Sequence, residues 1–538
     1  MCETSANNFL ILILIFRKTL MPDFVKLIGN DFRAAILLFP CPQKILMVTD
    51  SSLNFGTGGF GLSEFKDIVT SAGHSVSTAH RGGTAPVTIA GNFNFQTAAT
   101  AVTLANYDQM WLFGFSSTAL TGPEQQVIAA FMNSGGGVFA TGDHSTIGAG
   151  MGNNIPRVRL MRDWASVPMA SQDRHDTVVD IGPDNIKQFS DQSDDLPQRI
   201  FPIWLSNGGD QFIKSTWSVH PVLRHSSGAV DFLPDHPHES QCFGQAGVAG
   251  NFAGVEEWPQ ASDGSRPGAM VAAVSVSGGR FVESGAPTAS GTKPPVIPKL
   301  FGAISAYDGD RANVGRVVCD ATWHHFVNIN LNGSGSGREA MKPGGVATGE
   351  YLKIQTYYKN TVRWLAPRGR RNCWPWLQVV AVRFTFELLE ELRPEPHPCP
   401  WDPLIRIGAL TEEALTREFG PGAADTIVAD LLANAKGAPA LARAMRMRQP
   451  KTLKEGESDI DLLPRTEIRR AILGELMNAI VRDLPVDAEK LAEVLRKNHD
   501  ELAVKHSMLA VETAQRTVAG KMAGARKTLD MMFDGAVN

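Results

Sequence analysis

The sequence predicts an α/β domain with a doubly wound, mostly parallel sheet, interrupted by a long insertion and followed by an all-α region. Three observations carry this prediction. Short apolar runs that end in polar turns have the length of buried strands. Amphipathic segments with good capping residues separate these runs, as helices do in βαβ units. After residue 403 the chain becomes rich in Ala, Leu, Glu, Lys and Arg with helical spacing.

The first βαβ unit begins with an apolar run at residues 44–50, which ends in Asp-Ser-Ser and leads into a glycine-rich loop at 54–61. Helical spacing follows over residues 62–72. Gly73 is a suitable C-terminal cap, because glycine adopts the left-handed conformation without a steric penalty. Residues 75–80 are the second expected strand. The glycine-rich loop lacks the Lys-Ser/Thr of a phosphate-binding loop and is interpreted as a rim of the site.

The same pattern recurs with a strand at residues 107–114 and a helix that starts at Thr121. Thr121 and Glu124 form the signature of a capping box. Residues 138–141 are the next expected strand, and the chain turns sharply after it. Because doubly wound sheets place ligands beyond the carboxyl ends of their strands, a site is predicted at residues 142–146.

Residues 151–300 show weak periodicity and are interpreted as an insertion or lid. Strands resume at 300–305 and 315–320, and a helix at 351–365 closes the α/β domain, which therefore spans residues 44–367. Residues 368–403 are expected to be a proline-rich linker, and residues 404–538 a helical domain of three or more helices. Most of its charged faces are expected to be solvated, with a partner-binding or oligomerising face as the alternative.

Residues 1–43 form an N-terminal extension, expected to be unstructured or not native. The apolar run at 9–16 is too short to span a bilayer, and its basic residues follow it rather than precede it, unlike those of a signal peptide. A buried strand or a weak membrane contact are the alternatives. No membrane span is expected, and the default location is cytoplasmic.

Charge and cysteine content exclude several classes of protein. The net charge of −4, from 51 basic and 55 acidic residues, gives no global attraction to nucleic acid, and residues 368–371 form the only dense basic patch. The cysteines are widely spaced and contain no CxxC pair, which favours free thiols in a reducing compartment. They are Cys2, Cys41, Cys242, Cys319, Cys373 and Cys399.

Three segments carry a resemblance to a known family. They are SGGGVFATG at residues 134–142, GRVVCDATWHHF at 315–326, and the YYKN and WLAP motifs within 357–367. They resemble the class I glutamine amidotransferase-like superfamily, closest to its ThuA-like branch. The resemblance implies a flavodoxin-like sheet and a small-molecule, carbohydrate-related substrate. It does not extend to the insertion or the helical region.

The chain departs from that family at its nucleophile. A glutaminase needs an activated thiolate at the turn after the strand, but this sequence has Asp143 and His144 there. Cys319 lies within a β-run, where a buried structural thiol is the expected role. Ammonia release from glutamine is therefore not expected.

Two groups of acidic and imidazole side chains follow separate strands and are expected to meet at one sheet edge. Asp143 and His144 follow the first strand, and Asp320, His324 and His325 the second. Such pairs serve general acid–base catalysis, with Asp320 orienting one of the two later histidines. They also serve as ligands of a divalent metal that activates water. The sequence leaves both chemistries open, and Asp143 could instead cap its turn. Alternation puts only one of His324 and His325 toward a pocket, and the other is expected to be structural.

Further candidates lie nearby. Arg157, Arg159 and Arg162 could clamp an anionic or hydroxylated substrate, with a solvated helix face as the alternative, and Trp323 is a candidate substrate-binding residue. A second candidate metal site lies in the insertion, where a proline-fixed surface turn is the alternative. It consists of His236, His238 and Glu239.

Two functions follow from these candidates. The first is a hydrolase or carbohydrate-modifying enzyme with an Asp/His site, assisted by a metal in one version. The second is a non-catalytic amidotransferase-like module that binds or assembles through its C-terminal helices, as a homo-oligomer or with a protein partner.

Overall fold

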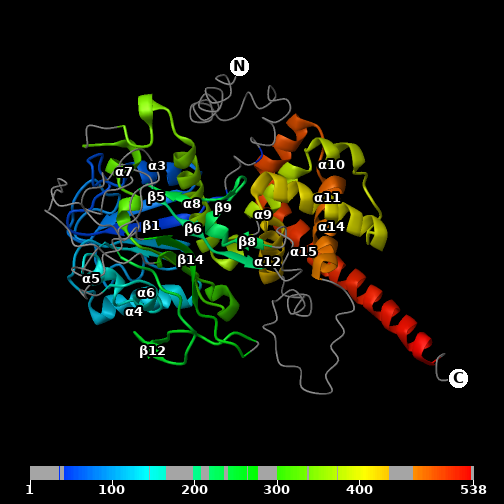
Figure 1. The fold of residues 1–538 in the computed structure, drawn as a ribbon, viewed down its shortest axis with the longest axis horizontal. Helices are drawn as coiled ribbons and strands as arrows, with labels where there is room; N and C mark the ends of the chain where they lie inside the picture. Colours follow the sequence, from blue (N-terminus) through cyan, green and yellow to red (C-terminus); the bar gives the residue numbers. More distant parts are fainter. Residues whose placement is uncertain are drawn as a thin grey trace.

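The computed structural model shows an α/β domain packed against a helical domain (Figure 1). It describes residues 36, 41–143, 146–164, 198–206, 217–234, 240–262, 264–276, 300–335, 339–371, 373–434 and 465–534. All structural statements below concern these residues.

An eight-stranded sheet forms the centre of the α/β domain, in the order β2-β1-β3-β4-β16-β15-β14-β6. The first five strands are parallel, and the remaining three pair antiparallel. The strands are β1 (Lys44–Thr49), β2 (Ser75–His80), β3 (Gln109–Phe113), β4 (Gly137–Thr141), β6 (Phe201–Pro202), β14 (Ala269–Val276), β15 (Leu300–Tyr307) and β16 (Val317–Asp320).

Both faces of the sheet are covered, which explains the uninterrupted apolar strands. Along β1, Ile45 and Met47 pack into one core while Leu46 and Val48 pack into the other. The first core is closed by α3 (Ser63–Ser71), α7 (Asn328–Asn332) and α8 (Gly349–Leu365). The second is closed by α4 (Gly122–Asn133) and two short helices, α5 (Ala149–Gly152) and α6 (Val158–Met161).

The local signals of the sequence are confirmed where they concern caps and strands. Thr121 and Glu124 form the expected capping box at the start of α4. Gly73 follows α3 with φ of 90°, the left-handed conformation expected of it. In the helical domain the backbone N–H of Lys490 donates to Asp487 Oδ1 at 3.0 Å, so Asp487 caps the last helix as predicted.

The insertion contributes to the main sheet rather than forming a separate lid. Its described residues supply β6 and β14, which extend the antiparallel edge beyond β15. They also form small two-stranded ladders: β5 (Gln198–Arg199) with β11 (Phe232–Leu233), β7 (Trp204–Ser206) with β8 (Trp217–Val219), β9 (Arg224–His225) with β10 (Gly228–Ala229), and β12 (Asn251–Phe252) with β13 (Val255–Glu256).

The helical domain begins earlier than the sequence indicated. Residues 373–391, assigned above to a linker, form two helices whose apolar side chains lie in the helical core. Trp376 and Val380 are fully buried there, and this burial outweighs the proline-rich flank that suggested a linker. The helices are α9 (Cys373–Val382), α10 (Phe386–Glu391), α11 (Trp401–Phe419), α12 (Ala423–Asn434), α14 (Arg465–Asp483) and α15 (Ala488–Asp534).

A disulfide between Cys41 and Cys373 corrects the expectation of free thiols. The two cysteines are 332 residues apart, so sequence spacing could not reveal their proximity. Cys242, Cys319 and Cys399 are free and buried. Disulfides persist mainly in oxidising compartments, and the pairing therefore gives no support to a cytoplasmic location. Within the described chain, no helix combines the length and apolar character needed to cross a membrane.

The arginines of the basic patch at residues 368–371 form ion pairs, some of which join the two domains. Arg371 contacts Asp310 of the α/β domain and Asp430 of α12. Arg368 also binds Asp310, with Nε 3.0 Å from Oδ1. Arg370 lies 3.5 Å from Asp108, so each arginine of the patch has a carboxylate partner among the described residues.

Buried His220 makes the stability of the protein depend on pH. Burial lowers its pKa to about 3 from the ordinary value of 6.5, with Asp308 opposing and Arg316 and Arg224 adding to the shift. Below pH 6.5 the unfolded chain binds a proton that the folded chain does not, so stability is lost as the pH falls.

We expect His220 alone to reduce the free energy of unfolding by about 1 kcal/mol between roughly pH 7.5 and pH 5.5. Urea unfolding at both pH values measures the loss. In His220→Asn, whose amide can still accept the Val222 N–H, this part of the pH dependence is expected to vanish. An unchanged pH dependence in that variant contradicts the assignment.

Candidate functional site at the carboxyl edge of the sheet

The turns after β4 and β16 lie side by side, as predicted. The two strands are parallel neighbours, with Thr141 paired to Asp320. Asp143 therefore comes beside the turn that carries His324, and Asp143 Oδ2 lies 3.6 Å from His324 Nε2. The structure thus brings together Asp143 and His324, which follow different strands, as predicted.

Thr322 joins the two turns. Its hydroxyl donates to Asp143 Oδ1 at 3.0 Å, and its backbone N–H donates to Asp320 Oδ1 at 3.3 Å. The same hydroxyl accepts the backbone N–H of His324 at 3.1 Å, so Thr322 also caps the short 3-10 helix Trp323–His325. One side chain therefore sets the position of His324 relative to Asp143.

A second aspartate–histidine pair lies behind the first. Asp320 Oδ1 is 2.6 Å from His325 Nδ1, and the Tyr357 hydroxyl donates to Asp320 Oδ2 at 2.7 Å. Tyr358 donates its hydroxyl to the carbonyl of His325. Burial, together with Asp320, raises the pKa of Tyr357 well above its ordinary value, so it stays a hydrogen-bond donor. Both members of the pair are 0% exposed, and they cannot touch a substrate.

His324 sits in a small aromatic wall that reaches the surface. Its ring stacks on Trp323, with centroids 4.3 Å apart, and Trp323 in turn stacks on Phe115. Phe60 approaches both rings edge-on and is 45% exposed. The side chain of His324 is 9% exposed, unlike that of His325. Of the two adjacent histidines, only His324 borders solvent.

Asn328 holds the glycine-rich loop that carries Phe60. Its side-chain N–H groups donate to the carbonyls of Gly56 and Gly58 at 3.0 and 2.8 Å. Its Oδ1 accepts the backbone N–H of Glu64 at 2.9 Å, at the start of α3. The loop is thereby fixed as one rim of the site.

Arg162 clamps the two turns from inside the protein. Its guanidinium donates to the carbonyls of Ala321 and Asp143 at 2.7 and 2.8 Å, and to that of Asp163 at 2.9 Å. The side chain is 1% exposed and stacks on Trp164. Arg162 therefore binds the chain itself. It neither clamps a substrate nor lies on a solvated helix face, the two alternatives that the sequence offered.

Arg157 and Arg159 lie elsewhere and do not form part of this site. Arg157 is buried and donates to the carbonyl of Glu257 and to Asn133 Oδ1, at the opposite end of α4. Arg159 makes a bidentate pair with the Glu257 carboxylate, at 2.9 and 2.7 Å. Their partner is about 100 residues away in the chain, which is why the sequence indicated free cations.

The free cysteines offer no nucleophile at this edge. Burial raises the pKa of Cys242 to about 12, and burial likewise raises that of Cys319 well above its ordinary value. A thiol becomes a nucleophile only as the thiolate. The expectation that Cys319 is a buried structural thiol is confirmed.

Several predicted site residues lie outside the described residues. They are His144 in the turn after β4, and His236, His238 and Glu239 in the insertion. Among described residues, the one group spaced like metal ligands is Cys373, His499 and Asp500, and its cysteine is already in the disulfide. The described residues thus provide a metal site neither at the sheet edge nor elsewhere.

Asp50 is a polar strand end that was not singled out from the sequence. It follows β1, and its Oδ1 accepts the backbone N–H groups of Phe115 and Ser116 at 2.7 and 2.9 Å. Arg81 lies 3.7 Å from its Oδ2 and 3.6 Å from Glu124. The sequence does contain a signal for Asp50: like Asp143, it comes directly after a predicted strand.

No protein-family model matches the chain, and no curated protein matches it.

Proposed function

We propose that the protein is a hydrolase or carbohydrate-modifying enzyme whose reacting groups are Asp143 and His324, and that it is not a glutaminase. The observation that carries this proposal is the Asp143–His324 pair, 3.6 Å apart where two parallel strands end. Imidazole beside carboxylate is the pairing that general acid–base catalysis uses near neutral pH.

The two aspartate–histidine pairs have different roles in this proposal. His324 borders solvent and takes or gives the proton at Nε2. Asp143 Oδ2 lies 3.6 Å from that nitrogen, beyond direct hydrogen-bond range, and its charge stabilises the imidazolium that forms. The buried Asp320–His325 pair is a positioning element, because neither side chain reaches the surface. A second imidazole in contact with the substrate is not part of this proposal.

A hydrolysable small molecule with a sugar-like ring fits the aromatic wall. Phe60, Trp323 and Phe115 offer apolar ring surfaces next to His324. Ligand sites commonly combine such surfaces with a few well-placed polar groups. A carbohydrate-related substrate remains the inference from the resemblance to ThuA-like proteins.

We propose that the parallel part of the domain is flavodoxin-like and related to the class I amidotransferase-like superfamily. The order β2-β1-β3-β4-β16 supports this, since it is the order 2-1-3-4-5 of that fold when the parallel strands are counted along the chain. The three antiparallel strands and the helical domain are additions to that pattern.

A panel of p-nitrophenyl esters, glycosides and phosphates tests the proposed activity. We expect the wild-type chain to hydrolyse at least one class, and Asp143→Asn to reduce kcat/KM about 100-fold or more. His225→Gln is the control and should retain activity, because His225 lies in β9 and its ring contacts Ser227 and no predicted site residue. Equal activity of Asp143→Asn and wild type overturns the proposal.

A non-catalytic assembly role is the second candidate, favoured by the shape of α15. After Val518 no described residue of this helix is buried, and the helix extends away from its neighbours (Figure 1). Met522 and Met531 are 38% and 59% exposed on this part.

We expect the full chain to oligomerise and a chain ending at Gly520 to lose that ability, measured by light scattering after size exclusion. Identical masses per particle would rule this role out for homo-oligomers.

A further inference from the structure

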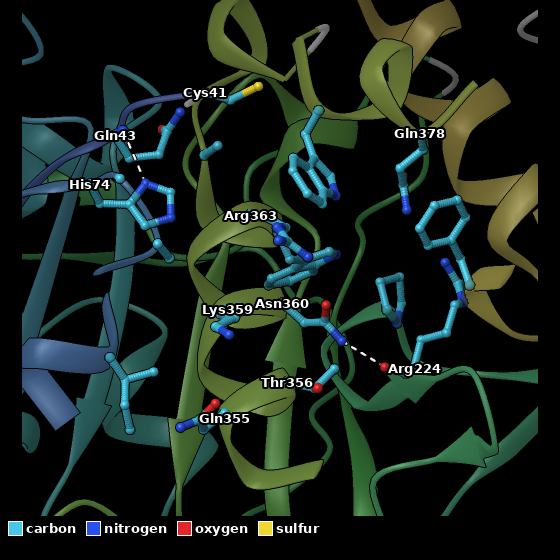
Figure 2. Close-up of a pocket in the computed structure, with 18 of the residues that line it drawn as sticks. Cys41, Gln43, His74, Arg224, Gln355, Thr356, Lys359, Asn360, Arg363 and Gln378 are labelled. Carbon is cyan, nitrogen blue, oxygen red and sulfur yellow. Dashed lines mark hydrogen bonds between the residues drawn. The ribbon is translucent and has the colours of Figure 1, made fainter. Parts of the chain in front are cut away.

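A cavity of about 1040 Å³ lies between the two domains, away from the Asp143–His324 site. Residues of α3 and α8 line it from the α/β domain, and residues of α9 and α12 from the helical domain. Figure 2 shows His74, Lys359 and Arg363 on the same side of this space. Its volume is that of a pocket for an organic ligand and exceeds what a single ion requires.

Two neighbouring cations of α8 line the cavity without a counter-ion among the described residues. Lys359 and Arg363 are one turn apart on α8, where like charges repel each other. No carboxylate among the described residues lies within ion-pair distance of either. The four acids that line the cavity pair with other bases: Glu64 with Lys342, Asp67 with Lys66, Glu418 with Arg417, and Asp430 with Arg371. The chain therefore maintains unbalanced positive charge in a partly buried space.

The remaining groups are suited to an anion with an organic part. His74 Nδ1 accepts the backbone N–H of Gln43 at 3.2 Å, which leaves Nε2 to carry a hydrogen and donate it. Burial, with Arg363 and Lys359, lowers the pKa of His74 to about 3, so its ring is neutral. The Arg363 guanidinium lies 3.5 Å from the ring centre of Trp374, which fixes its plane beside an aromatic face.

We propose that this cavity binds a phosphorylated small molecule, with its phosphate group held by Lys359, Arg363 and His74. A guanidinium fork, an ammonium point charge and a neutral N–H donor together match a phosphate dianion in charge and in hydrogen bonding. The organic part would lie against Trp364 and Trp374, which also line the cavity. Because both domains line the space, the bound ligand stabilises their association.

The reactivity of the Lys359 amine can report whether an anion is bound in the cavity. Burial, with Arg363, lowers its pKa to about 8, so near that pH a large fraction of its amine is uncharged and reactive. A bound dianion favours the charged form of the Lys359 amine.

The experiment measures acetylation of lysine amines in the full chain at about pH 8 by mass spectrometry. The rates are compared without ligand and with inorganic phosphate, adenosine monophosphate or adenosine. Lys497, exposed and paired with Glu493, is the internal control.

We expect phosphate and adenosine monophosphate to slow the acetylation of Lys359 about tenfold, while adenosine has no effect and Lys497 is unchanged. Adenosine monophosphate should act at lower concentration than phosphate. In Arg363→Gln, which leaves the Asp143–His324 site intact, the concentration needed should rise at least tenfold. Unprotected Lys359 at millimolar ligand, or equal protection by sulfate, phosphate and adenosine monophosphate at equal concentration, overturns the proposal.

Discussion

Replacing Arg162 with methionine is expected to lower the free energy of unfolding by about 4 kcal/mol. The guanidinium donates to three backbone carbonyls, of Asp143, Asp163 and Ala321, in a region that excludes water. A buried acceptor that loses its donor costs about 1–3 kcal/mol. Methionine fills much of the space against Trp164 but supplies no donor. Urea denaturation measures the loss.

Arg159→Met is the matched control for this experiment. Like Arg162, Arg159 is an arginine whose guanidinium makes hydrogen bonds. Unlike Arg162, its side chain is 31% exposed, and its partner Glu257 still accepts the backbone N–H of Arg157 when Arg159 is replaced. We expect it to lose less than half as much stability as Arg162→Met. If the two variants are equally stable, Arg162 does not clamp the two turns.

The adjacent histidines are expected to respond in opposite ways to the same substitution. His324→Gln should reduce kcat/KM about 100-fold or more on the substrate identified by the panel, with a stability change below about 1 kcal/mol. His325→Gln should lower the free energy of unfolding by about 2 kcal/mol, because Asp320 loses its imidazole partner in a fully buried place.

Parallel measurement of kinetics and urea unfolding for both variants separates the roles. At a temperature where the His325→Gln variant is still folded, this variant should keep most of the wild-type kcat/KM. The His325 side chain does not touch the substrate and affects it only by positioning the turn that carries His324. If His325→Gln abolishes activity while His324→Gln leaves it intact, the roles assigned here are reversed and the proposal fails.

The sheet and its site edge were predictable because they depend on local signals. Strands buried on both faces read as continuous apolar runs, and β1, β3 and β4 all have that form. Parallel neighbours then bring their carboxyl ends together, so the strand pattern predicts that Asp143 lies near the turn of His324. Alternation also indicated that only one of His324 and His325 faces outward.

Features that depend on distant pairing were not predictable. Glu257 neutralises Arg159 from 98 residues away, and Cys41 reaches Cys373 across 332 residues. No local pattern marks such partners. The helix α9 was missed for a related reason. Its burial comes from packing against α11, α14 and α15, while its proline-rich flank favours a linker.

A double-mutant cycle tests the central claim most directly. The loss of kcat/KM is measured for Asp143→Asn, for His324→Gln and for the two combined, on one substrate. If the two side chains act as one catalytic unit, the double variant loses about as much as the more damaging single variant. Losses that multiply would show that the two groups act independently and would contradict the account.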